Sequence, residues 1–240
     1  MRDRLTERLP LLLGLTFLAL AVGLGSVAIA DGIRDRNRGD VITVTGSAKR
    51  RITSDYVIWW LSVSSQQSTT AEAARELARW TTRTRAFLES EGVRGDELTV
   101  QPISTETLTG DSGEVIGYRL SRTLEIRSPR VEEVANVAEA SARLAAEGIP
   151  VAAQPLQYVY TKLPDLRPEL LADATRDAQN RARVLVEATG AALGSVRGVD
   201  VGVFQVTSPN STDVSDYGIY DTSTLEKDVT AVVNVTFVLK

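Results

Sequence analysis

The chain has 240 residues, a formal net charge of −4, and neither cysteine nor histidine. Without these two residue types it cannot form disulfides, thiolate nucleophiles, Cys/His zinc sites or an imidazole base. The acidic balance argues against a general nucleic-acid surface, and any catalysis would have to use carboxylates, lysine, tyrosine or an activated hydroxyl.

An uncharged apolar segment runs from Leu9 to Ala30. A helix of this length, at about 1.5 Å per residue, can cross the roughly 30 Å hydrocarbon layer of a bilayer. The arginines among residues 1–8 and the small-x-small sequence at residues 28–30 are also typical of a cleaved signal peptide. Because the segment exceeds the roughly 7–15 residues of an ordinary signal core, we expect a retained anchor, with cleavage after Ala30 as the alternative.

These features divide the chain into four expected parts. Residues 1–8 form an N-terminal tail, residues 9–30 the anchor, residues 31–40 a charged tether and residues 41–240 the folded domain. Arginines lie on both sides of the anchor, so the distribution of positive charge does not fix its orientation.

The first half of the domain predicts strands with one helix between them. A short strand from Val41 ends at Gly46-Ser47, and residues 56–63 are apolar at both parities, which predicts a strand covered on both faces. A capping box at Thr69 to Glu72 starts a helix that runs up to Gly92. A hairpin follows, with strands at 96–109 and 115–127 around a turn at 110–113.

The second half predicts two more helices and three strands. The second helix is capped by Ser128, with Pro129 in its first turn, and ends at Gly148. The remaining expected elements are a strand at 151–160, a helix at 166–189, a strand at 195–206, a polar loop at 207–227 and a strand at 228–239. The order β-β-α-β-β-α-β-α-β-β indicates an α+β fold, with helices packed on a mixed or antiparallel sheet.

Five residues are candidates for an interface or binding site. Trp59 and Trp60 lie in the apolar strand, where core packing competes with a subunit or ligand contact. Arg122 shares strand parity with Tyr118, Leu120 and Leu124, so a regular strand would direct its charge at the core unless the strand ends, bulges or supplies a carboxylate partner. Tyr217 and Tyr220 lie in the polar loop, where exposed aromatic residues favour binding and loop self-packing is the alternative.

The carboxylates offer little evidence of chemistry. Asp173 and Asp177 lie one helical turn apart and could act as an acid/base pair or as cation ligands. Arginines surround them in the sequence, which favours a solvated charged face. The sequence therefore predicts no catalytic residue, no metal site and no cofactor.

Several motifs resemble the SIMPL-domain family when taken in order. They are VITVTG at residues 41–46, GYRLSRT at 117–123, an alanine-spaced helix and the alternating last strand. The helix carries Ala174, Ala178 and Ala182 and ends in Gly190, followed by Leu193-Gly194. Residues 55–61 and 160–174 are similar to a membrane-anchored bacterial subgroup, whereas Arg122 stands where relatives often have a smaller polar residue.

The resemblance implies a place in the bacterial envelope and carries over no active site. Some relatives are associated with oxidative-stress tolerance and some form ring-shaped or channel-like oligomers. It also implies that residues 1–8 are cytoplasmic and that the domain lies outside the cytoplasmic membrane. We therefore expect a single-pass, non-enzymatic assembly or envelope-stress module that forms homo-oligomers. The alternatives are a periplasmic adaptor that binds a ligand or an envelope protein, and a carboxylate-based hydrolase.

Overall fold

The computed structural model describes residues 40–240, so the expected anchor and nearly all of the tether lie outside the described residues. Among residues 40–240, no helix is both long and apolar enough to span a bilayer. The described chain forms two compact units. Unit 1 comprises residues 40–46, 175–201 and 233–240, and unit 2 comprises residues 47–174 and 202–232. The fold is α+β, as the sequence predicts.

Unit 2 contains a six-stranded sheet in which every pairing is antiparallel. Its two long central strands pair along almost their whole length, from Val57 opposite Ser128 to Gln67 opposite Tyr118. Four short strands flank them. The strands are β2 (Tyr56–Gln67), β3 (Leu98–Val100), β4 (Ser104–Thr109), β5 (Val115–Ser128), β6 (Val151–Ala153) and β7 (Gln157–Val159).

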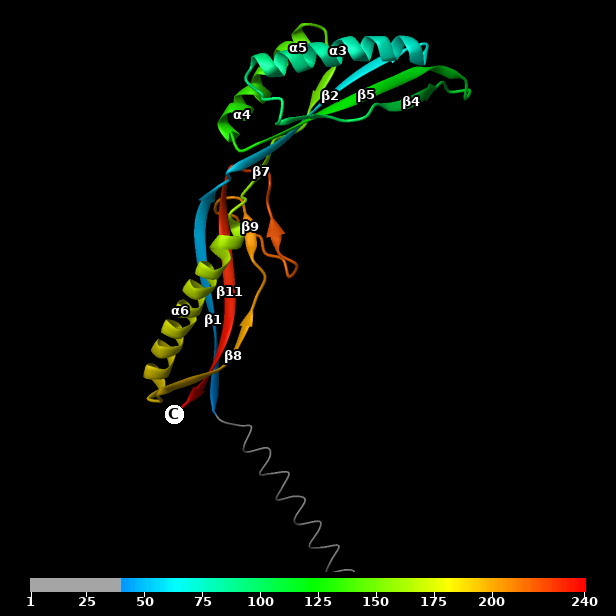
Figure 1. Ribbon diagram of the computed structural model, residues 1–240. Helices are drawn as coiled ribbons and strands as arrows, with labels where there is room; N and C mark the ends of the chain where they lie inside the picture. Colours follow the sequence, from blue (N-terminus) through cyan, green and yellow to red (C-terminus); the bar gives the residue numbers. More distant parts are fainter. Residues whose placement is uncertain (1–39) are drawn as a thin grey trace, which may run out of the picture. The chain divides into compact units, whose positions relative to one another are not determined.

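Three helices cover one face of this sheet: α3 (Thr70–Ser90), α4 (Val131–Ala140) and α5 (Ala142–Ala146) (Figure 1). The β2 side chains that face them, Val57, Trp59, Leu61 and Val63, are fully buried. The alternate residues Ile58 and Trp60 are only half-buried, opposite Arg127 and Glu125 of β5. The prediction that β2 is covered on both faces is therefore wrong for the second face, where long polar side chains flank the apolar ones.

The capping box that the sequence predicts is present at the start of α3. Thr69 is the N-cap, its hydroxyl accepts from the backbone N–H of Glu72 at 3.3 Å, and it donates to the Glu72 carboxylate at 2.7 Å. The helix ends at Ser90 with Glu91 as its C-cap, and Gly92 follows with a φ of +97°, which suits glycine.

Prolines divide two of the expected strands. Pro102 separates β3 from β4, and Pro155 separates β6 from β7, because proline cannot donate a hydrogen bond to a neighbouring strand. Ser128 does not cap the second helix as expected. It ends β5 and its hydroxyl donates to Glu97 at 2.6 Å, while Arg130 occupies the N-cap position of α4.

A second sheet has the order β1-β11-β9-β10, with β8 also paired to β11. Its pairing is antiparallel between β11 and both β8 and β9, and parallel between β9 and β10, a short strand within the loop that the sequence predicts. The strands are β1 (Val41–Thr53), β8 (Leu193–Val201), β9 (Gln205–Thr207), β10 (Ile219–Tyr220) and β11 (Glu226–Leu239). The helix α6 (Leu163–Thr189) completes the element list, and β1, β11 and α6 each contribute residues to both units.

Strand β1 continues through Thr53, well past its expected end at Gly46-Ser47. The continuation carries three consecutive charged residues, Lys49, Arg50 and Arg51. Each of these charges has a carboxylate partner: Arg50 pairs with Glu169 and Asp173, and the other two pair with Asp228. Paired charges are tolerated on a strand face that is not fully buried.

In unit 1 the sheet has one apolar and one polar face. Val233, Val235 and Phe237 of β11 are buried, as are Ala178 and Ala182 of α6, which runs beside β1 and β11 (Figure 1). Small side chains let a helix approach a sheet closely. On the other face, hydroxyls of β1 bond to β11 through the pairs Thr43 with Thr236 and Thr45 with Asn234.

Candidate functional site

The two tryptophans of β2 have different environments. Trp59 is fully buried and its indole Nε1 donates to the backbone oxygen of Gln154 at 3.0 Å, so it is a core residue with a satisfied polar atom. Trp60 lies half-buried on the opposite face of the sheet. Only Trp60 is therefore placed where a partner could contact it.

Arg122 points toward the face of the sheet that the helices cover. It lies opposite Val63 in an unbroken β2–β5 register, which excludes both a bulge and a strand end at this position. The side chain is half-buried, and its buried Nε has no hydrogen-bond partner among the described residues. The structure also gives Arg122 no carboxylate partner within residues 40–240, so none of the three expected explanations applies.

The two loop tyrosines also differ. Tyr217 is 98% exposed. The Tyr220 hydroxyl accepts from the backbone N–H of Tyr160 at 3.0 Å and lies 3.2 Å from that residue's carbonyl oxygen. Tyr220 therefore fixes the loop to the segment before α6, and Tyr217 remains available to solvent.

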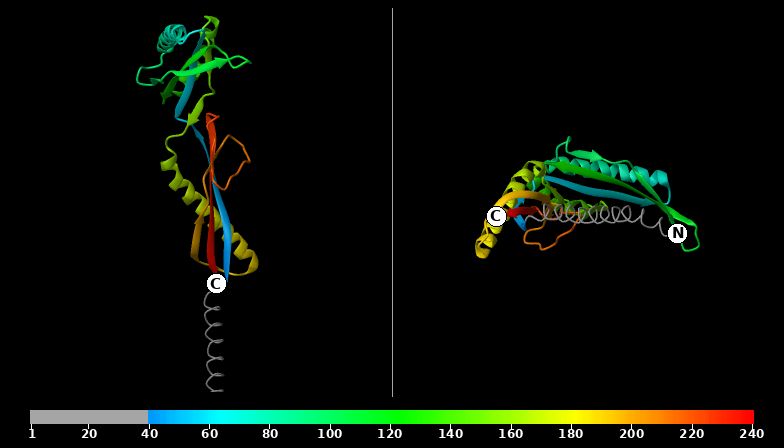
Figure 2. Two further views of the ribbon diagram at one scale, coloured as in Figure 1. Left: turned by 90° about the vertical axis from the view of Figure 1, so that its right-hand side faces the viewer. Right: turned by 90° about the horizontal axis from the view of Figure 1, so that it is seen from below.

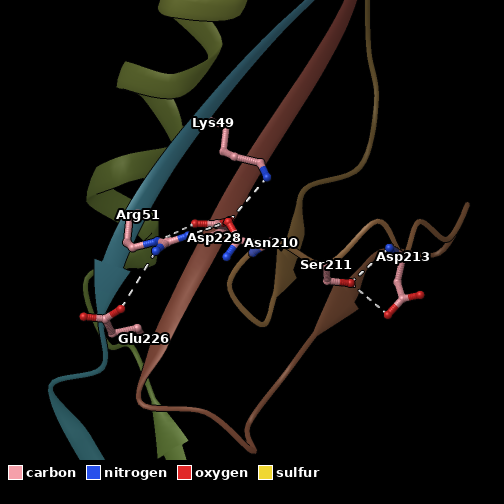
Figure 3. A network of polar contacts seen from close by, with 7 residues as sticks. All are labelled: Lys49, Arg51, Asn210, Ser211, Asp213, Glu226 and Asp228. Carbon is pink, nitrogen blue, oxygen red and sulfur yellow. Dashed lines mark hydrogen bonds and ion pairs between the residues drawn. The ribbon is translucent and has the colours of Figure 1, made fainter.

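A buried carboxylate, Asp228, lies among Lys49, Arg51 and Asn210 in Figure 3. It accepts from Arg51 Nε at 2.9 Å, from Lys49 Nζ at 3.3 Å and from the backbone N–H of Asn210 at 3.1 Å. The Arg51 guanidinium, with these other donors, holds the pKa of Asp228 well below its usual range. The donors occupy both carboxylate oxygens, so the cluster fixes the loop at Asn210, which has a φ of +61°, and leaves little room for a substrate.

Lys227 is a second buried charge, on the same face of β11 as Val229. Its ammonium group donates to the carbonyl oxygen of Thr224 and lies 3.6 Å from the Asp221 carboxylate. Burial lowers the pKa of Lys227. Burial alone would raise the pKa of Asp221, but hydrogen bonds from Thr224 and Ser223 outweigh it and bring the value to about 2. A fully buried amine cannot reach a substrate, so this pair also serves the fold.

Glu97 forms a third buried polar cluster, at the start of α4. Arg130 and Ser128 donate to its carboxylate, as does the backbone N–H of Arg94 at 2.9 Å. The Arg130 guanidinium is the main reason that the pKa of Glu97 falls to about 2. The carboxylate is therefore an ionised structural group.

The helical carboxylates pair with arginines. Asp173 lies 3.2 Å from Arg50, and Asp177 lies 2.8 Å from Arg181 one turn along the helix. Residues 40–240 contain no group of three or more acidic side chains placed to hold a metal ion. This arrangement agrees with the charged face that the sequence favours.

Strand β8 exposes a row of valines that sequence reasoning missed. Val196, Val199 and Val201 are 51–54% exposed. They lie opposite Phe237, Val235 and Val233 of β11, which are buried, so all three valines belong to the apolar face of the sheet.

A β-bulge produces this alignment. Thr236 pairs with Gly198 and Phe237 pairs with Val196, which leaves Arg197 as an extra residue in β8. The extra residue shifts the side-chain alternation by one, so that Val196 faces the same way as Val199. Strict alternation in the sequence assigns Val196 to the other face, and the row is therefore not visible from the pattern alone.

An apolar groove of about 600 Å³ lies in unit 1 between β1 and α6. Residues 43–45 of β1 form one wall, and Arg181, Val184 and Leu185 of α6 contribute to the other. Val184 and Leu185 are 66% and 51% exposed, although they are among the most apolar residues of the helix. Exposed apolar residues that line a groove are typical of interaction surfaces.

Comparison with known proteins gives one informative match. The SIMPL family, described as a protein of unknown function (DUF541), matches residues 42–237. No curated protein matches the chain significantly. Among solved structures, the crystal structure of a hydrolase from Listeria innocua is 10% identical and covers 80% of this chain and 91% of that one, with a TM-score of 0.20.

That structural likeness is too low to bear on fold or activity. The family match extends over nearly all of the described residues, from the second residue of β1 to Phe237, two residues before the end of β11. It includes the motifs that carry the resemblance in the sequence. The chain belongs to the SIMPL family.

Proposed function

We propose that this protein is a non-enzymatic assembly module, anchored by Leu9 to Ala30 and facing the outside of the cytoplasmic membrane. The valine row of β8 carries the proposal, because its three apolar side chains are each about half exposed and lie on an edge strand. An edge strand presents unpaired backbone N–H and C=O groups, which another strand can pair with.

The energetic balance indicates what else an interface needs. Complete burial of a valine is worth about 1.5–3 kcal/mol, so covering three half-exposed valines contributes about 3 kcal/mol. Association costs about 4–15 kcal/mol in lost motion. The valine row therefore requires main-chain hydrogen bonds and further apolar contact on the partner.

The polar clusters support a non-enzymatic role. Asp228, Glu97 and Asp221 are each enclosed by donors from the same chain, and Lys227 is inaccessible. If Asp173 and Asp177 have no chemical role, replacing both with Asn leaves any measured biological activity unchanged. Loss of that activity at an unchanged melting temperature would instead favour the hydrolase or cation-site hypothesis.

Sedimentation of the full-length chain in detergent tests self-association. We expect a species larger than a monomer that dissociates on dilution, and Val199→Lys should shift the equilibrium toward monomer. Val214→Lys is the matched control, because Val214 is also an exposed valine but lies in the loop. A monomer at every concentration would refute the proposal, and a complex found only with another envelope protein would favour the adaptor hypothesis.

Membrane fractionation tests the anchor separately. We expect the chain to remain in the membrane fraction after carbonate washing, and a protease added outside the cytoplasmic membrane to reach the folded domain. A soluble product that begins at Asp31 would show that Leu9 to Ala30 acts as a signal peptide.

A further inference from the structure

We infer that copies of this chain join in one direction, with β8 of one copy adding to the free edge of β1 in the next. The inference rests on the proposed self-assembly and specifies the two surfaces that meet. All the residues that carry it belong to unit 1.

The two edges lie on opposite sides of β11 (Figure 2). β8 is antiparallel to β11. β1 is antiparallel to it as well, since Asp40 bonds to Leu239 and Thr43 to Thr236. Both edge strands therefore run in the same direction, and within residues 40–240 neither is paired on its outer side.

The apolar surfaces of the two edges match. The valines of β8 lie on the face of the sheet that also holds the buried residues of β11. The groove beside β1 is bounded by α6, which lies over that same face. If β8 of another copy adds to the sheet beyond β1 with its apolar side on this face, its valines point toward Val184 and Leu185.

The bulge at Arg197 makes the match possible. Without it, Val196 would point to the polar face of the sheet, which carries Thr45 and Asn234. With it, three valines line one side of a strand nine residues long. The side chains on this side serve as the specificity element of strand addition, and the backbone groups of the β1 edge supply the hydrogen bonds.

This mode of joining has a definite symmetry. Each copy offers one β8 edge and one β1 edge, so the contact is heterologous and the new strand pair is parallel. Such contacts generate rings where the rotation closes and filaments where it does not. Pairing of β8 with β8 would instead stop at an antiparallel dimer and leave Val184 and Leu185 exposed.

Mixing two edge variants of the full-length chain in detergent tests the direction of joining. Val199→Lys blocks the β8 edge, and Leu185→Lys blocks the groove, so that the two blocked surfaces carry the same charge and repel each other. We expect each variant alone to associate at least tenfold more weakly than the wild type, while the Val214→Lys control behaves as the wild type. A 1:1 mixture should recover complexes of two copies and nothing larger, because each pair retains one intact β8 and one intact groove.

Cysteine cross-linking provides the second measurement, and the natural chain has no cysteine to interfere. Thr45 and Asp200 both lie level with Asn234, on opposite edges of the polar face. With a short bis-maleimide, a 1:1 mixture of the single variants Thr45→Cys and Asp200→Cys should give a covalent dimer. Each single variant on its own, and the exposed control Tyr217→Cys, should stay uncross-linked.

The outcomes separate this inference from the proposed function. A covalent dimer formed by Asp200→Cys alone would overturn the β8-to-β1 contact, as would a Leu185→Lys variant that associates as strongly as the wild type. In both cases self-assembly itself would stand. A wild-type chain that is monomeric throughout overturns self-assembly itself.

Discussion

Strands β2 and β8 place the same residue type on the helix-covered side of their sheets, with different results. Val63 in β2 is 0% exposed, and Val199 in β8 is 52% exposed. β2 has a strand on each side and α3 and α4 above it, whereas β8 is an edge strand within the described residues. An apolar row identifies the face of a strand, and only the neighbouring elements determine whether that face is covered.

The largest expected effect is in β2, the strand that neighbouring elements cover. Replacement of Trp59 by Ala removes a fully buried indole and its hydrogen bond to Gln154, so we expect a loss of about 3–5 kcal/mol in the free energy of unfolding. Urea denaturation measures it. The matched control is Trp60→Ala on the half-buried face, which should cost clearly less. Equal losses for the two variants would contradict the difference between the faces.

A matched pair of valines sharpens the comparison itself. Val63→Ala should cost about 2 kcal/mol in unfolding free energy, because it opens a cavity in a closed core. Val199→Ala should cost less than about 0.5 kcal/mol in the monomer. It should, however, weaken self-association in sedimentation, which Val63→Ala should not do at temperatures where the protein is folded. If Val199→Ala cost more unfolding free energy than Val63→Ala, β8 would be the covered strand and β2 the uncovered one.

A buried ion pair gives unit 2 a sensitivity to acid. The pKa of Glu97 is lowered from 4.5 to about 2 in the folded state, so its stabilising effect is complete above pH 4.5 and is lost as the pH falls through about 2. Glu97→Gln should therefore cost about 1.5 kcal/mol at neutral pH. The difference between variant and wild type should shrink as the pH approaches 2. A difference that is independent of pH would assign the cost to packing alone.

The smallest expected effects concern the loop tyrosines. Tyr220→Phe removes the hydroxyl that bonds to the backbone of Tyr160, at a cost of about 0.5–1 kcal/mol. Tyr217→Phe should leave the melting temperature unchanged, because that side chain is almost wholly exposed. A measurable shift for Tyr217→Phe in the monomer would show that its ring is covered in solution.

Local sequence signals predict the elements well where a few residues decide the outcome. The capping threonine of α3 and the turn at residues 110–113 are both found as expected, since each depends on contacts within one turn of chain. The strand β2 also follows from its continuous apolar run, and β5 follows from the alternation of its apolar and polar residues. Pro102 and Pro155 mark strand breaks that the prediction overlooked.

Long-range contacts account for what the sequence could not predict. The extension of β1 depends on Asp228 and Glu169, more than one hundred residues away in the chain. The role of Tyr220 depends on Tyr160, and the valine row depends on a bulge against β11. Among the five candidate residues, Trp59 and Tyr220 have structural roles. Trp60 and Tyr217 are accessible to different degrees. Nothing in the structure explains the position of Arg122.

One glycine of the family motif has a clear physical reason. A Cβ at Gly194 would lie 2.6 Å from the carbonyl oxygen of Val238, closer than any side chain allows. Glycine therefore permits the end of β11 to approach the start of β8, next to the irregular register that follows. The motif residue is explained by backbone packing and needs no ligand.

The burial of Lys227 makes this side chain a chemical reporter of local opening. The chain has four lysines, and Lys49 and Lys162 are more than half exposed. An amine-reactive reagent should modify those two at once and Lys227 only when the first residues of β11 separate from the loop that encloses them. The rate of that slow modification, measured by mass spectrometry, would report how often this region opens, without any engineered label.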